Sequence, residues 1–212
     1  MIALAVLIDG CSRPQPADEP AATPQQPAGR PLAPLATQAV ALFPAQYLRM
    51  GDSTVGAPRL GPAPAVLASL DSALAAELAL RGTARSWVMA DALTRTARRN
   101  PAFTSDPHAL SAESLRPGVR RTNPRLGEPL ASQMRSLVAL TEARFGLIPV
   151  ELRFEGGPTS GTRAILRLVL VDARLAQIQW SDDVSTDVTS TSSTREIAAA
   201  LARRVADLLV AP

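Results

Sequence analysis

Three stretches near the C-terminus alternate apolar and polar residues, and this pattern limits the fold more than any other feature of the chain. The alternation has the two-residue period of β-strands, and it recurs at 150–155, 164–171 and 177–188. The connections between the stretches, at 156–161 and 174–176, are short. We therefore expect three consecutive antiparallel strands, each paired with the next.

The same period predicts which side chains share a face of each strand. Val150 is expected on the same face as Leu152 and Phe154. In the third strand, one face is expected to hold four apolar residues: Ile178, Trp180, Val184 and Val188.

Helical patterns surround these strands. Apolar residues at steps of three and four predict an amphipathic helix from about Val66 to Leu78, and a similar pattern predicts another over 128–144. Asp91 is a candidate cap for a short helix that ends at Asn100. A capping-box sequence at 193–196 opens a final helix.

Short apolar runs at 39–44 and 85–90 predict two more strands, which gives the element order β-α-β-α-α-β-β-β-α. This order predicts an α+β fold: a mixed sheet with a C-terminal antiparallel three-strand meander and with helices packed on it. Residues 38–212 are expected to form this single α/β domain. Residues 100–127 are rich in Pro and Arg and are expected to be irregular, with a helical turn near 111–115.

The N-terminus has a different composition. Residues 2–8 are continuously apolar, which is too short to span a bilayer, and Cys11, the only cysteine, follows closely with Gly10 before it. This resembles a bacterial lipobox, although Asp9 stands where a small residue is usual. The resemblance implies that 1–11 is a signal peptide with Cys11 as the lipid-attachment residue. The alternative is a buried apolar strand with a free thiol.

Residues 12–37 carry seven prolines among Ala, Gln and Asp, a composition typical of extended chain that does not fold alone. We expect a tether between the membrane and the domain. In the sorting logic of such lipoproteins, Ser12 after the cysteine implies the periplasmic face of the outer membrane.

The inventory of reactive residues is small and excludes several chemistries. All 22 basic residues are Arg, and there is one Cys and one His, His108. A Cys/His zinc cage, a P-loop and a lysine Schiff base cannot be built from this set. Asp182, Asp183 and Asp187 are the one acidic cluster, and we interpret it as a solvated strand edge, with a weak Ca²⁺ site as the alternative. No catalytic residue, cofactor or metal is expected.

Basic residues are concentrated in the middle of the chain, where 81–144 carries 11 Arg and 5 acidic residues. Export and the lack of interleaved aromatic residues make nucleic acid an unexpected partner. The segment is a candidate for contact with an anionic surface or an acidic partner, and the alternative is a solvated Arg-rich loop. The candidate contact residues are Arg95, Arg98, Arg99, Arg120 and Arg121.

The C-terminal third resembles a known family. Residues 143–149 (ARFGLIP) lead into a hairpin with LRLVLVDAR at 166–174 and QIQW at 177–180, and a helix at 197–207 closes the domain. This pattern is similar to the amino-terminal domain of TolB and to related curli-assembly and penicillin-binding-protein-activator lipoproteins, with Ala176 near the position of their usual turn glycine. The resemblance implies a periplasmic binding module without catalysis, and it carries over no active-site residue.

These observations predict a non-enzymatic, lipid-anchored periplasmic module that docks an envelope partner. The alternative is an enzyme-like module that binds a small ligand or glycan, with residues 100–127 as a lid. A deep pocket around Arg98, His108 and Asp183 would favour the alternative, whereas an exposed sheet edge or helix groove would favour docking. The oligomeric state cannot be derived from these patterns.

Overall fold

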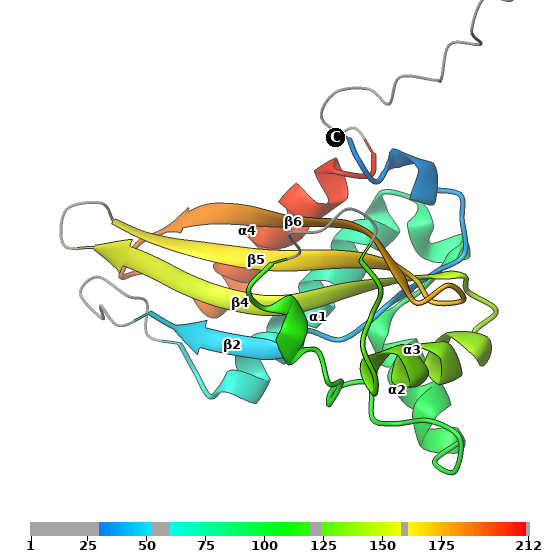
Figure 1. Ribbon diagram of the computed structural model, residues 1–212. Coiled ribbons are helices and arrows are strands. Elements are labelled where there is room, and N and C mark those ends of the chain that lie inside the picture. Colours follow the sequence, from blue (N-terminus) through cyan, green and yellow to red (C-terminus); the bar gives the residue numbers. More distant parts are fainter. Residues whose placement is uncertain (1–29, 52–59, 119–123, 158–160, 211–212) are drawn as a thin grey trace, which may run out of the picture.

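The computed structural model describes residues 30–51, 60–118, 124–157 and 161–210, and these form an α+β domain, as predicted (Figure 1). The strands are β1 (Val40–Leu42), β2 (Tyr47–Met50), β3 (Trp87–Val88), β4 (Phe145–Gly157), β5 (Gly161–Asp172) and β6 (Gln177–Val188). The α-helices are α1 (Ala63–Leu80), α2 (Ala90–Arg99), α3 (Leu130–Ala139) and α4 (Thr194–Asp207). Short 3-10 turns lie at Ala33–Leu35, Thr83–Arg85 and Glu113–Leu115.

The strands form one mixed sheet in the order β3-β1-β4-β5-β6. The predicted antiparallel meander is confirmed, because β4 pairs with β5 and β5 with β6 along nearly their whole lengths. At the other side of β4, two strands pair with it in parallel: β1 along 145–147 and β2 along 151–154. The sequence patterns did not predict β2, and they placed the start of β4 several residues too late.

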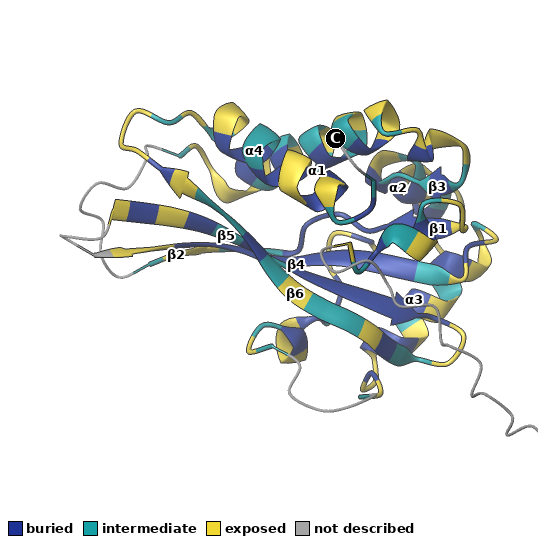
Figure 2. Cartoon of the chain, turned by 90° about the horizontal axis from the view of Figure 1, so that it is seen from above, coloured by how far each residue is buried: buried dark blue, intermediate teal, exposed yellow. Residues whose placement is uncertain are grey.

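The first face of the sheet is covered by α1 and α4, which Figure 1 shows behind the strands and Figure 2 shows side by side above them. Leucines of α1 and α4, among them Leu70, Leu74 and Leu201, pack on Leu147, Leu166 and the other apolar residues of this face. The helix α1 has the length and composition of a membrane span, with a mean hydropathy of 1.4. Its buried stripe packs against the sheet and α4, as in the core helix of a soluble domain.

The second face is covered at one end by α2, α3 and the segment 110–115. Val150 and Ile178 lie in this second core, whereas Leu152, Phe154, Trp180, Val184 and Val188 belong to the first. The prediction that each set shares one face is therefore wrong. A β-bulge between Pro149 and Glu151 and another opposite Leu170 and Val171 each insert one residue, which reverses the side-chain alternation.

Two helix boundaries differ from the predictions. The helix α3 ends at Ala139 rather than near 144, because Glu142 takes a left-handed conformation (φ 55°) that turns the chain into β4. The helix α2 begins at Ala90 with Met89 as its cap, so Asp91 lies inside the first turn instead of capping it. The expected capping box of α4 is confirmed at Ser193 and Glu196.

The last residues of the segment expected to be a tether are packed on the domain. Leu32 is fully buried and Leu35 nearly so, and both belong to the first core. The amide of Leu32 donates to the carbonyl of Leu208, and the Trp87 indole donates to the carbonyl of Leu35. The packed region therefore includes residues 30–37, and the predicted signal peptide and the remainder of the tether lie outside the described residues.

Candidate functional site

The second face of the sheet changes character at the β4 bulge. On one side of the bulge this face is apolar and covered, and beyond it the same face of β4, β5 and β6 carries charged residues. Among the described residues, no α-helix covers the charged part, and the segment 113–118 borders it (Figure 1). We call this region the charged half-face, and its members are Glu151, Arg153, Glu155, Arg163, Ile165, Arg167, Asp183, Ser185 and Asp187.

The middle of the charged half-face is held by Asp183 on β6. Both of its carboxylate oxygens accept hydrogen bonds from Arg167, at 2.8 and 2.7 Å, and Oδ2 also accepts from Nη2 of Arg153 at 2.7 Å. Burial alone would raise the pKa of Asp183, but the hydrogen bonds from Arg167 and Arg153 outweigh it and lower the pKa below its usual value. Asp183 is therefore a fixed anion that links three strands.

A second ion pair closes the side of the half-face next to β2. Glu151 is buried (3% exposed) and accepts from Nε of Arg116 at 2.7 Å, with a second contact from Nη2. Arg116 also lies over the Tyr47 ring, 5.0 Å from its centroid, and its carbonyl accepts from Nη1 of Arg167. The segment that follows Glu113–Leu115 is thus tied to both β4 and β5.

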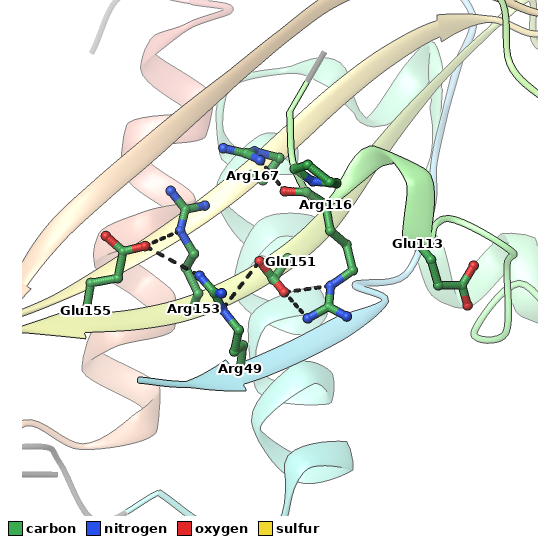
Figure 3. A pocket seen from close by; sticks show the side chains of 8 residues that line it. Arg49, Glu113, Arg116, Glu151, Arg153, Glu155 and Arg167 are labelled. Carbon is green, nitrogen blue, oxygen red and sulfur yellow. Dashed lines mark hydrogen bonds and ion pairs between the residues drawn. The ribbon is translucent and has the colours of Figure 1, made fainter. Parts of the chain in front are cut away.

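Between these ion pairs lies an open pocket of 520 Å³ (Figure 3). Glu155 accepts from Nε of Arg153 at 2.7 Å, and Arg49 stands 3.6 Å from the same carboxylate. Nη1 of Arg153 is buried and has no hydrogen-bond partner among the described residues. The lining residues are Arg49, Glu113, Arg116, Pro117, Glu151, Arg153, Glu155 and Arg167.

Tyr47 borders this region from β2. Its hydroxyl donates to the carbonyl of Leu110 at 3.1 Å. Burial, followed by the neighbouring Glu113 carboxylate, raises the pKa of Tyr47 to about 12, so the phenol stays neutral and acts as a hydrogen-bond donor.

The outer edge of β6 borders the charged half-face on its other side. The described residues pair with this edge only at its start, where Arg125 forms a bridge with Gln177 and the amide of Ile178 donates to the carbonyl of Pro124. Asp183 and Asp187 point to the charged half-face, toward Arg167 and Arg163, while Asp182 lies on the opposite face. The expectation of a solvated strand edge thus fits the exposed Asp182 and Asp187, whereas Asp183 is partly buried and bound by two arginines.

The pocket is lined mainly by charged groups. Its lining holds guanidinium and carboxylate groups and a proline, and no Ser, Thr, Cys, His, Lys or Tyr from the described part of the chain. Two of its carboxylates, Glu151 and Glu155, are engaged by arginines. The described residues contain no group of three or more His, Cys, Asp or Glu arranged to hold a metal ion.

The arginines predicted as contact residues lie elsewhere. Arg95, Arg98 and Arg99 are exposed on α2, and Arg95 pairs with Asp91 at 2.6 Å. Arg98 and Arg99 form no ion pair within the described residues. The predicted contacts Arg120 and Arg121 and the lipid-attachment residue Cys11 lie outside the described part of the chain.

The pocket that would have favoured a ligand-binding enzyme does not form from the three residues considered. His108 contacts Thr94 of α2 at 3.3 Å, whereas Asp183 belongs to the charged half-face. The segment 100–127, which the alternative treats as a lid, contributes Leu110, Leu115 and Leu126 to the second core. Gln46 fixes this segment further: it donates to the carbonyl of Pro107 and accepts from the amide of Leu110.

Sequence reasoning missed the charged half-face itself. Its arginines and carboxylates occupy the polar positions of alternating strands, and such positions are ordinarily solvent-facing. A signal was present, because charges of alternating sign occur at 151, 153 and 155, two arginines at 163 and 167, and two aspartates at 183 and 187. Cross-strand pairing turns these into a connected network.

Comparisons with known proteins give distant structural similarities. No family model and no curated protein matches the chain. Similar solved structures include a PelC dodecamer from Paraburkholderia phytofirmans (15% identity, 82% of this chain and 88% of that chain, TM-score 0.42) and the LpoB C-terminal domain from Salmonella enterica (16%, 74% and 96%, 0.39). Lipoprotein GNA1162 from Neisseria meningitidis is another (16%, 72% and 81%, 0.34).

Proposed function

We propose that this protein is a non-enzymatic binding module of the bacterial cell envelope that docks a protein partner on its charged half-face. Lipid on Cys11 holds it at the periplasmic face of the outer membrane, and residues 12–29 act as the tether. The observation that carries the proposal is the contrast on the second face of the sheet, where one half is covered by helices and the other is left open among the described residues.

The charged half-face has the properties of a prepared polar interface. Its side chains are held in place by ion pairs before any partner arrives, so little side-chain entropy is lost on binding. Ile165, half-buried between Arg153 and Ser185 in the cross-strand register, supplies an apolar centre. An apolar centre with a polar rim is the usual anatomy of a docking surface.

The free edge of β6 extends this surface. Its backbone groups beyond Ile178 have no partner strand among the described residues, and an extended segment of a partner can add to such an edge. Asp182 and Asp187 are exposed beside it and favour a partner segment with basic side chains.

Charge reversal on the half-face tests docking. Arg163 is 59% exposed and pairs with Asp187 at 3.4 Å, so Arg163→Glu changes the surface with little effect on the core. In affinity capture from detergent-solubilised native envelopes, we expect the Arg163→Glu variant to capture no partner. The control variant, Arg203→Glu on the exposed side of α4, should capture the partner as the parent does. Equal capture by both variants would exclude the half-face as the docking site.

The anchor needs its own experiment. Cells fed labelled palmitate should label the full-length chain, and Cys11→Ser should abolish the label and release the protein from the membrane fraction. A Cys11→Ser chain that still carries label would contradict lipid attachment at this residue, and it would leave the docking proposal to be judged by the capture experiment.

A further inference from the structure

A second surface lies at the end of α2, distinct from the charged half-face. Arg98 and Arg99 are exposed in the last turn of the helix and form no ion pair within the described residues. Phe103 follows them and is 77% exposed, although a phenyl ring in water is unfavourable. Pro101 and Ala102, between them, are exposed as well.

Hydrogen bonds hold this turn in place. The amide of Phe103 donates to the carbonyl of Asn100 at 3.0 Å, and the amide of Thr104 donates to the same carbonyl at 3.2 Å. The side chain of Asn100 donates to the carbonyl of Thr96 at 2.9 Å, and the Thr104 hydroxyl donates to the carbonyl of Asn100 at 3.1 Å. The fold therefore presents the Phe103 ring to solvent from a structured turn.

The electrostatic surroundings favour an anionic partner. No acidic residue occurs from 92 to 105. Of the flanking acids, Asp91 pairs with Arg95, and Asp106 accepts the amide of His108 at 2.9 Å. The two unpaired guanidinium groups therefore keep most of their charge for an external ligand.

We propose that this surface, Arg98, Arg99 and Phe103, contacts a membrane rich in anionic phospholipid, with the phenyl ring inserted among the head groups and both arginines bound to lipid phosphates. One projecting aromatic ring beside unpaired cations fits the interfacial region of a bilayer, because the ring enters the apolar boundary while the guanidinium groups stay among the phosphates.

The geometry favours a lipid surface over a second protein partner. A stable protein interface buries roughly 800 Å² on each side around a packed centre, whereas this surface consists of a single turn and the end of one helix. Its affinity for a membrane is expected to be weak by itself. Such contact becomes effective for a chain already held at a membrane, where the effective concentration of lipid is high.

Vesicle binding tests the proposal with the full-length chain carrying Cys11→Ser, so that no acyl group contributes. Sedimentation with vesicles of phosphatidylglycerol and phosphatidylcholine should show binding that falls about tenfold with Phe103→Ser and again with Arg98→Gln plus Arg99→Gln. Binding to vesicles of pure phosphatidylcholine should differ little between the parent and these variants, because such vesicles lack net negative charge.

Matched control substitutions test whether the loss of binding is specific to this surface or follows from removing any exposed arginine or apolar side chain. Leu175→Ser removes another exposed apolar side chain (57% exposed), and Arg203→Gln plus Arg204→Gln removes two exposed arginines of α4. Both controls should retain binding. Equal losses with the control substitutions, or no loss with the Phe103 and arginine substitutions, would overturn the proposal.

A direct readout of depth comes from Phe103→Trp. Its additional fluorescence should be quenched by brominated lipid chains in anionic vesicles, beyond any change seen for the parent with Trp87 and Trp180. Absence of extra quenching would contradict insertion of residue 103. A different outcome would also overturn the proposal. If the substitutions leave vesicle binding unchanged but Phe103→Ser abolishes capture of an acidic protein, the partner of this surface is a protein and not a membrane.

Discussion

The two halves of the second sheet face are built from the same three strands but stabilised in different ways. Near β1, valine and isoleucine side chains such as Ile148, Val169 and Val171 are fully buried under helices. Near β2, the equivalent positions carry arginines and carboxylates that pair across the strands. The strands are continuous through both halves, so the difference lies in the side chains and in what covers them.

This difference separates stability from recognition. Apolar burial contributes roughly 25 cal/mol per Å² and holds the covered half together. Ion pairs that remain partly exposed contribute little net stability, because desolvation offsets their attraction. The charged half-face is thus free to be specialised for binding, and the β4 bulge at Val150 marks the boundary between the two halves.

The largest expected effect comes from the covered half. Leu137 of α3 is 1% exposed, and Leu137→Ala should lower the free energy of unfolding by about 2–5 kcal/mol in urea titrations. Leu140→Ala, at the end of the same helix and 40% exposed, is the control and should change stability by less than about 1 kcal/mol. Similar losses for both would mean that α3 does not seal a core.

The next largest loss of stability is expected at the junction between the two halves. Gln46 is buried, and its side chain bonds the carbonyl of Pro107 and the amide of Leu110. Gln46→Leu leaves both groups without a partner and should destabilise the fold by about 2–3 kcal/mol in thermal or urea unfolding. The exposed Gln179→Leu is the control, and a Gln46→Leu protein as stable as the parent would show that the segment is not fixed through this residue.

Within the charged half-face, the loss of stability on neutralising a carboxylate should increase with its burial. Glu151→Gln removes the charge that faces Arg116 and should cost about 1–3 kcal/mol, since Glu151 is 3% exposed. Glu155 is 51% exposed, and Glu155→Gln should cost at most about 1 kcal/mol. The two unfolding free energies measured side by side check this order, and a larger loss at Glu155 would contradict it.

A separate effect, on the first face of the sheet, is a pH dependence. Burial raises the pKa of Asp71 on α1 to about 7, although its carboxylate accepts the amide of Ala45 at 2.8 Å. A raised pKa favours the folded state when the group is protonated, so this contribution is complete below pH 4 and lost as pH rises through 7. Asp71→Asn keeps the acceptor without the charge.

Unfolding free energies measured at several pH values check this dependence. The parent should lose up to about 4 kcal/mol relative to Asp71→Asn between pH 4 and pH 8, because the pKa is about three units above its usual value. Parallel pH profiles for the two proteins would show that the Asp71 carboxyl is well solvated in the folded state.

Much of the fold followed from sequence because its signals are local. The meander, the stripe of α1 and the capping box of α4 each depend on neighbouring residues, and all three are present. Ala176 also adopts the positive φ (50°) expected at the place of a turn glycine. The bulges at Val150 and Gln179 were invisible, since an extra residue in a strand depends on its cross-strand partners.

The candidate site was harder to predict than the fold. Arg153, Asp183 and Arg116 come from β4, β6 and the segment before α3, and only the tertiary structure brings them together. The short strand β2 was missed for the same reason, because its pairing with β4 spans about a hundred residues of chain. The exposed arginines of α2 were found from sequence, but Phe103 beside them was not singled out.

Site-specific photocrosslinking in native envelopes tests the central claim most directly. A photoreactive phenylalanine analogue placed at Ile165, in the middle of the charged half-face, is compared with the same analogue at Ala68 on the exposed side of α1. Docking through the charged half-face predicts a crosslinked envelope protein from position 165 and none from position 68. Identical adducts from both positions, or none from position 165, would contradict it.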